Sequence, residues 1–267
     1  MQGWTLSLVG ALLFALLQSA LSESQGDLSA LRNVCGNRIV DLTYPFNNNT
    51  LYWNEGARFR INITKIEDPP KGWYQDDELT APTHGGTHLD APIHFSRHGW
   101  SASEIPLSRL VGVPIALIDV KSKAANNSDY RLSVGDVQRW EAKHGPLPNG
   151  SLLIMRSGRG KLWPNKTAYF GIDQNGTRHF PAVHQRTARW LTTMRRIYGL
   201  GLDTPSVDLG NSTALRTHRI LSARNIYIIE NMAYLHRVPA RGAVALVMPM
   251  KNEGASGAPV RVAAILP

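Results

Sequence analysis

The segment 84–95 constrains the fold of this chain more than any other, because it combines three histidines with two glycines and a proline. Gly85, Gly86 and Pro92 disfavour a helix, although two of the histidines have the i, i+4 spacing of helical zinc-binding motifs. In an extended chain, residues of equal parity lie on the same face. We therefore expect an extended segment with four potential ligands on one face: His84, His88, Asp90 and His94.

Imidazoles and a carboxylate in this combination suit zinc or manganese. Asp90 carries two oxygens, so it could bridge two ions. Two further candidates, His218 and Glu230, lie far downstream, and Glu230 closes an apolar run. A buried acid needs a partner, because an unpaired buried charge is unfavourable. The partner of Glu230 is either a metal ion or one of two nearby arginines, Arg219 and Arg224.

Apolar runs predict strands along most of the chain. They fall at 38–42, 114–120, 152–155, 197–202, 226–229, 243–248 and 260–266. Phe59, Ile61 and Ile63 alternate with polar residues, which is the period-2 pattern of a half-buried strand. Many strands with few helices predict an α/β domain built on a large mixed, partly barrel-like sheet.

Two helices are expected between these strands. Ser133 can cap the first, with Asp136 at its third position, and Val137 and Trp140 share one face until Gly145 ends the helix. The second covers 184–196, and three of its side chains are predicted to face inward: Ala188, Leu191 and Met194. No linker divides 23–267, so we expect a single domain there.

The N-terminus reads as a signal peptide over 1–22. Leu6 to Leu17 is almost purely apolar, and small residues suited to cleavage follow at Ala20 and Ser22. The run is short for a membrane span, and an uncleaved anchor is the alternative. We expect a secreted, extracellular protein without a membrane partner after cleavage.

Glycosylation signals agree with export. Seven Asn-X-Ser/Thr sequons occur, at Asn48, Asn62, Asn126, Asn149, Asn165, Asn175 and Asn211. In a chain with a signal peptide, they predict an N-glycosylated surface.

Cys35 is the only cysteine, so an intramolecular disulfide is impossible. The net charge is +9, from 29 basic and 20 acidic residues. The basic residues are scattered with no run longer than two, so we expect no nucleic-acid partner.

The segment 84–95 resembles the His-X-Gly-Thr-His-X-Asp-X-Pro-X-His-Phe signature of the cyclase-like metal-dependent hydrolases. This family includes bacterial-type kynurenine formamidases and isatin hydrolases. The resemblance continues through 41–43, 201–208 and 257–261, and it includes the pair His218 and Glu230. It therefore covers nearly the whole chain after the signal peptide.

The resemblance implies a swivelling β/β/α fold and association into homodimers or higher oligomers. It implies that His84, His88 and Asp90 bind one metal ion, that Asp90, His218 and Glu230 bind a second, and that His94 is the catalytic histidine. The cofactor would be Zn²⁺, as one or two ions, with Mn²⁺ as the alternative. Trp53 and Phe95 could form a slot for an aromatic amide substrate, or belong to the core.

Three activities remain open on the sequence. Hydrolysis of N-formylkynurenine to kynurenine and formate is favoured, and opening of a cyclic amide, as in isatin hydrolases, is the first alternative. A secreted metal-containing binding protein without turnover is the second. A serine hydrolase is disfavoured because the candidate elbows 210–214 and 254–258 lack the last glycine of Gly-X-Ser-X-Gly.

Overall fold

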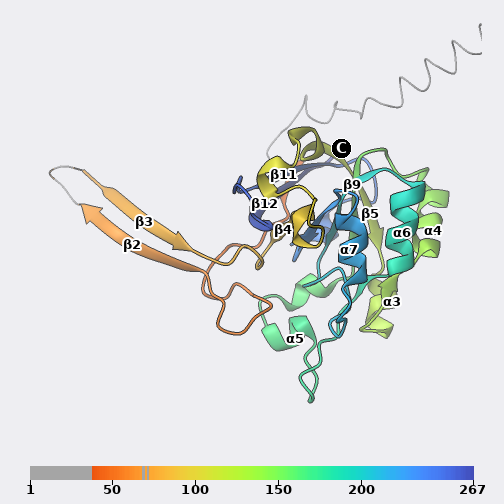
Figure 1. The fold of residues 1–267 in the computed structure, drawn as a ribbon, viewed down its shortest axis with the longest axis horizontal. Coiled ribbons are helices and arrows are strands. Elements are labelled where there is room, and N and C mark those ends of the chain that lie inside the picture. Colours follow the sequence, from red (N-terminus) through yellow and green to blue (C-terminus); the bar gives the residue numbers. More distant parts are fainter. Residues whose placement is uncertain (1–37, 68–69, 71) are drawn as a thin grey trace, which may run out of the picture.

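The computed structural model describes residues 38–67, 70 and 72–267 (Figure 1). The predicted signal peptide and Cys35 lie outside the described residues. Within the described part, no helix has the length and apolar character needed to cross a membrane.

Seven strands form a closed, barrel-like sheet in the order β12-β11-β5-β7-β9-β10-β4, with β4 pairing back to β12, and β1 extends the sheet beyond β12. The strands are β1 (Ile39–Asp41), β4 (His88–Asp90), β5 (Val111–Asp119), β7 (Ser151–Arg156), β9 (Ile197–Leu202), β10 (Tyr227–Glu230), β11 (Val244–Pro249) and β12 (Gly257–Ile265). Strands β5, β7, β9 and β10 run parallel, whereas β11, β12 and β4 join antiparallel. The predicted mixed, partly barrel-like α/β fold is confirmed.

Helices cover one side of the parallel strands (Figure 1). The five α-helices of the described part are α3 (Lys121–Asn126), α4 (Val134–His144), α5 (Lys166–Phe170), α6 (Gln185–Met194) and α7 (Arg216–Ser222). Short 3₁₀ turns are η2 (Pro92–His94), η3 (Ala102–Glu104), η4 (Leu107–Arg109), η5 (Arg159–Leu162) and η6 (Leu235–Arg237). A small parallel pair, β6 (Arg131–Leu132) and β8 (Ala182–Val183), precedes α4 and α6 along the chain.

The sheet is buried on both faces, which explains why its parallel strands are continuous apolar runs. In β7, Leu152 and Ile154 belong to the core inside the barrel, together with residues of β11 and β12. Leu153 and Met155 alternate with them and belong to a second core beneath α4 and α6. The strand therefore separates two apolar layers.

The two predicted helices are present as α4 and α6. Ser133 and Asp136 form the expected capping box of α4, which ends at Gly145 with a φ of 83°. In α6, Ala188 and Leu191 are buried as predicted. The inward position of Met194 is wrong, because its side chain is 59% exposed where the helix ends and the chain becomes extended.

A two-stranded hairpin projects from the body, formed by β2 (Arg60–Glu67) and β3 (Tyr74–Thr80) (Figure 1). The predicted strand around Ile61 and Ile63 is therefore present. Its predicted half-burial is wrong, since these side chains are 54% and 57% exposed. The hairpin extends away from the body, and no other described segment covers it.

Candidate metal centre

The centre is built at the closure of the barrel, where the three-residue strand β4 lies between β10 and β12. The register places Glu230 of β10 opposite His88, and Gly257 of β12 opposite Asp90. Paired positions on adjacent strands hold their side chains about 5 Å apart. Strand pairing therefore brings together ligands separated by 142 positions in the chain (230 minus 88).

His84 and His94 reach the centre through turns. The backbone bends at Gly86, whose φ is 57°, and a 3₁₀ turn begins at Pro92. The expected extended conformation is thus wrong outside β4, because the glycine and proline that exclude a helix also favour turns. The four residues predicted from parity still converge, since the first turn brings His84 to Asp90 and the second brings the ring of His94 onto that of His84.

Asp90 is the hub of the cluster. Its Oδ1 lies 2.7 Å from His84 Nδ1 and 3.2 Å from His88 Nε2. Its Oδ2 lies 3.4 Å from His218 Nε2. The two carboxylate oxygens thus face different histidines, which is the geometry of a bridging ligand.

Glu230 completes the second half of the cluster. Its Oε1 lies 3.3 Å from His218 Nε2 and accepts a hydrogen bond from the backbone amide of Val207 at 3.2 Å. Its Oε2 lies 3.6 Å from His88 Nε2. The partners of Glu230 are therefore not the two arginines considered from the sequence.

In His218 and His88, a hydrogen bond from one ring nitrogen fixes which other nitrogen faces the carboxylates. His218 Nδ1 donates to Asp208 at 2.8 Å, and His88 Nδ1 donates to the carbonyl of Gly86 at 3.1 Å. Asp208 is itself held by the backbone amides of Thr217 and His218. Metal-binding histidines in proteins are usually oriented in this way, leaving Nε2 free to bind the ion.

The charges at the centre depend strongly on one another. Burial alone would raise the pKa of Asp90, but hydrogen bonds from three histidines, including His218, hold it well below its usual range. Burial and the nearby Asp90 raise the pKa of Glu230. Burial alone would lower the pKa of His88, but contact with Asp90 and the charge of Glu230 raise it to about 9. The buried carboxylates of Asp90 and Glu230 would therefore be stabilised by a positive charge placed between them.

This donor set fits a divalent cation. Two groups each bring three ligand atoms within 4.8 Å of one another: His84, His88 and Asp90, and Asp90, His218 and Glu230. They share Asp90, and their nitrogen and oxygen atoms are the types that Zn²⁺ and Mn²⁺ accept. The residues present could hold one ion or two.

His94 belongs to neither ligand group, but lies against the first. Its ring stacks on His84 with 3.9 Å between centroids and 21° between planes. Phe95 packs against His218, with ring centroids 4.5 Å apart. Burial lowers the pKa of His94 to about 4, so the ring is neutral at pH 7 and can accept a proton.

Trp53 occupies a different environment from Phe95. Its ring meets the edges of Phe170 and Phe180, and the guanidinium of Arg178 lies 4.0 Å from its centroid. Of the two aromatics proposed to form a substrate slot, the contacts of Phe95 place it at the centre, whereas Trp53 packs on the α5 region.

Three residues that position the candidate ligands were assigned no role from the sequence. Asp208 orients His218, and Ser256 lies 2.9 Å from His84 Nε2 through its hydroxyl. Asn231 follows Glu230 with a φ of 57°, and its amide donates to the carbonyl of Gly86. The only sequence signals were that Asp208 ends the stretch 201–208 of the family resemblance, that Ser256 precedes the stretch 257–261, and that Asn231 is polar at the end of an apolar run.

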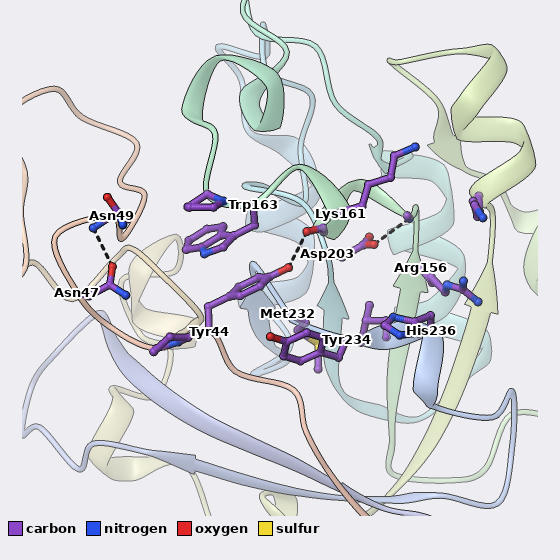
Figure 2. Close-up of a pocket in the computed structure, with 16 residues that line it drawn as sticks. Tyr44, Asn47, Asn49, Arg156, Lys161, Trp163, Asp203, Met232, Tyr234 and His236 are labelled. Atoms are coloured by element: carbon purple, nitrogen blue, oxygen red, sulfur yellow. Dashed lines mark hydrogen bonds between the residues drawn. The ribbon is translucent and has the colours of Figure 1, made fainter.

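A pocket of about 560 Å³ opens at the carboxyl ends of β5, β7 and β9 (Figure 2). The ring of Tyr44 stacks on that of Trp163, with 4.3 Å between the two centroids. In Figure 2, Asp203 lies beyond the hydroxyl end of the Tyr44 ring. Met232 lines this pocket two residues after Glu230, so the segment that leaves β10 runs from the centre to the pocket.

Comparison with known proteins points to one family. A family model described as putative cyclase matches residues 40–209. The chain is 27% identical to the isatin hydrolase of Roseibium aggregatum over 245 residues, covering 86% of this chain and 92% of the relative. It is 28% identical to a kynurenine formamidase of Bacillus cereus over 226 residues, covering 83% and 94%.

A solved structure shows the same fold. Isatin hydrolase A from Labrenzia aggregata, bound to benzyl benzoate, superposes with a TM-score of 0.78 at 28% identity, covering 94% of this chain and 98% of that one. Because the family model spans more than half of the chain, the chain belongs to the cyclase family.

Proposed function

We propose that this chain is a metal-dependent hydrolase that cleaves the carbon–nitrogen bond of an aryl amide. The observation that carries the proposal is the position of His94. Its neutral ring stacks directly on a candidate ligand, His84, but is not part of either ligand group. A protein that only stored metal would not require such a base beside its ligands.

In the proposed hydrolysis, five residues bind the metal and His94 transfers the proton. His84, His88, Asp90, His218 and Glu230 would hold the metal, which supplies Lewis-acid activation of water and of the amide carbonyl. His94 accepts the proton of the attacking water as the carbon–oxygen bond forms. It then returns that proton to the leaving nitrogen as the carbon–nitrogen bond breaks. Phe95 packs against His218 and so helps to hold this ligand in place.

Two substrate classes fit this chemistry. A linear aryl formamide such as N-formylkynurenine is the substrate favoured by the sequence, with kynurenine and formate as products. The cyclic amide of isatin is the second candidate, because the structural match to isatin hydrolase A extends over nearly the full length of both chains. Both reactions need water activated beside a planar aromatic ring.

For the metal we propose zinc, with manganese as the alternative, because histidine and carboxylate ligands accept both. We also propose that the protein is secreted and N-glycosylated. This is supported by the apolar N-terminal run and by the exposure of all seven sequon asparagines. A mobility shift after enzymatic deglycosylation of protein collected from the medium of a secretory host checks the second proposal.

To test the activity, the protein is purified from the medium of a secretory host and its metal content is measured. Its hydrolysis of N-formylkynurenine and of isatin is then assayed with and without a chelator. Chelator-sensitive hydrolysis of either compound supports the proposal, and the ratio of kcat/KM values assigns the substrate class. Stoichiometric metal with no hydrolysis of either compound would instead favour a metal-containing binding protein. A metal-free preparation with full activity would contradict the proposal.

A further inference from the structure

The pocket at the carboxyl ends of β5, β7 and β9 has no part in the proposed chemistry, because none of the five candidate metal ligands is among the described residues that line it. Asn231 lies between the ligand Glu230 and the pocket residue Met232, and it is buried. Its amide accepts a hydrogen bond from Tyr169 and donates one to the carbonyl of Gly86. The volume of about 560 Å³ lies within the range of small-molecule sites, about 300–1,000 Å³. The pocket is therefore large enough for a ligand of its own.

One side of the pocket is aromatic. It contains the stacked rings of Tyr44 and Trp163, and the ring of Tyr234 lies 6.0 Å from that of Tyr44, measured between centroids. Tyr234 is 49% exposed, and its φ of 50° is uncommon for an aromatic residue. Figure 2 shows these three rings to the left of Arg156 and His236. They offer a flat ring an apolar surface to pack against.

The other side of the pocket is basic. Arg156 and His236 lie there in Figure 2, and the lining also includes Lys121 and Lys161. Arg156 forms an ion pair with Asp119 at 3.1 Å. Among the described residues, Lys121 and Lys161 have no ion-pair partner, unlike three other lysines of the chain. Two ammonium groups at the pocket are therefore available to an anion.

Asp203 is the one acidic residue in the described lining, and both of its oxygens are already occupied. Oδ1 accepts hydrogen bonds from the backbone amide and the hydroxyl of Ser157, both at 2.7 Å. Oδ2 accepts one from the amide of Gly158 at 2.8 Å. Asp203 therefore holds the loop after β7 in place and is not free to bind a cation. With both carboxylates ionised, the three cationic side chains of the lining exceed Asp203 and Asp119 by one charge.

We propose that this pocket binds a small aromatic monoanion, a compound of one or two rings with a carboxylate group. Its ring packs against Tyr234 and the stacked pair beside it, and its carboxylate faces Lys121 and Lys161. Hydrogen bonds from ionised donors to a carboxylate are about twice as strong as those between neutral groups. A surplus of one positive charge matches a carboxylate better than a phosphate ester, which carries about 1.5–2 negative charges at pH 7.

This site is independent of the proposed hydrolysis, because no candidate metal ligand contributes to it. The ligand is selected by two features together, a flat ring and a single negative charge. A compound that has only one of them would leave either the aromatic side or the basic side of the pocket without a partner. The proposal therefore makes separate predictions for the ring and for the charge.

The class of ligand is tested by isothermal titration calorimetry of the metal-loaded protein with anthranilate, which has both features. Two analogues each remove one of them: 2-aminobenzamide has a neutral amide in place of the carboxylate, and cyclohexanecarboxylate lacks the aromatic ring. We expect saturable binding of anthranilate, and at least tenfold weaker binding of each analogue.

No measurable binding of anthranilate at millimolar concentration would overturn the proposal, as would equal binding of either analogue. Phenyl phosphate is the further comparison, because it keeps the ring and carries more charge. Tighter binding of phenyl phosphate than of anthranilate would overturn the choice of a carboxylate.

Variants determine whether the binding takes place in this pocket. Lys161→Met removes an exposed cation of the lining and is expected to weaken anthranilate binding at least tenfold, whereas Lys143→Met, at an exposed position on α4, leaves it unchanged. Tyr234→Asn removes an aromatic ring but keeps a residue type that tolerates a positive φ, and a similar loss is expected. Tyr74→Asn is its control, because Tyr74 is 48% exposed and lies on the β2–β3 hairpin.

Circular dichroism and metal content show that each variant is folded and that its metal centre is intact. Neither Lys161 nor Tyr234 is a candidate metal ligand, so both pocket variants are expected to keep the metal content of the wild type. If a folded Lys161→Met or Tyr234→Asn variant binds anthranilate as the wild type does, the anion binds elsewhere, and the assignment of this pocket is wrong.

Discussion

At the residue scale, the centre depends on the different environments of the two oxygens of Asp90. Oδ1 faces His84 and His88, and Oδ2 faces His218. The two candidate ligand groups are therefore not independent, and a change at Asp90 would affect both. His94 differs from them because its nearest described partners are aromatic and histidine rings, which leave its nitrogens available to water and substrate.

Replacing His94 separates chemistry from metal binding. His94→Ala is expected to retain the metal content of the wild type and to lower kcat by about 10²–10⁴-fold, the usual contribution of a general acid–base group. Elemental analysis and steady-state kinetics on the same preparation measure both quantities. His94→Ala with wild-type kcat would remove His94 from the mechanism.

Replacing Asp208 tests its role in orienting His218. Asp208→Asn keeps the size of the side chain but weakens the hydrogen bond to Nδ1, and loss of such partners costs about 10–100-fold in metal affinity. The affinity is measured by competition with a chromogenic chelator. Asp173→Asn, at the turn after α5, serves as the control and should leave the affinity unchanged. Equal affinities for Asp208→Asn and wild type would refute the assignment.

Gly257 leaves the space that His84 occupies. A Cβ added there would lie 2.5 Å from His84 Cε1 and 2.8 Å from the carbonyl oxygen of Leu89. Gly257→Ala is expected to displace His84 and lower the metal bound per chain. Gly135→Ala is the control, because its Cβ would meet the flexible end of Arg139 at 3.2 Å and Ser133 Oγ at an ordinary contact distance of 3.7 Å. Identical metal content in both variants would show that the ring has room to move.

The ligand types could be predicted from the sequence, but their supporting residues could not. His84, His88 and Asp90 lie within seven positions of one another, so local spacing reveals them. Ser256 and Asp208 act on histidines that are 172 and 10 positions away. Such contacts depend on strand closure and helix placement, which no local pattern encodes.

At the element scale, short and polar elements account for what the sequence did not predict. Runs buried on both faces, such as β7 and β9, are recognisable because nearly every residue is apolar. β4 has only three residues, two of them candidate ligands. β3 contains the acidic run Asp76-Asp77-Glu78, and such residues are depleted in strands. Its strand conformation comes from pairing with β2 rather than from its own propensity.

Helix α4 offers a prediction at this scale. Burial alone would raise the pKa of Asp136, but contacts with Lys123, Tyr130 and Ser133 hold it well below its usual range. A carboxyl with a depressed folded-state pKa stabilises the fold above its unfolded pKa of about 4, and this contribution is lost as pH falls towards the folded value. Asp136→Asn is therefore expected to lower the unfolding free energy at pH 7 by about 1–3 kcal/mol.

Urea unfolding of wild type and Asp136→Asn across acidic pH checks this sign. The difference in free energy should be constant from pH 7 to about pH 5 and should shrink below about pH 4. Glu253→Gln, at an exposed carboxyl, provides the matched control and should show no such difference. A difference that grows as pH falls would contradict the assignment of Asp136 as the stabilising group.

At the scale of the whole molecule, the candidate centre lies where the barrel closes. β4 joins β10 to β12, and His218 reaches the same point from α7. A bound ion would therefore connect segments that are distant in the sequence. It would also neutralise the buried carboxylates of Asp90 and Glu230. Metal binding, catalysis and closure of the sheet are thus expected to depend on the same few contacts.

The most direct test of this account is the rate of aryl amide hydrolysis by chelator-treated protein as Zn²⁺ or Mn²⁺ is added back in known equivalents. The rate is expected to rise from near zero and to level off at one or two equivalents per chain, because the two ligand groups share Asp90. Full activity in the chelated protein before any metal is added would contradict the central claim.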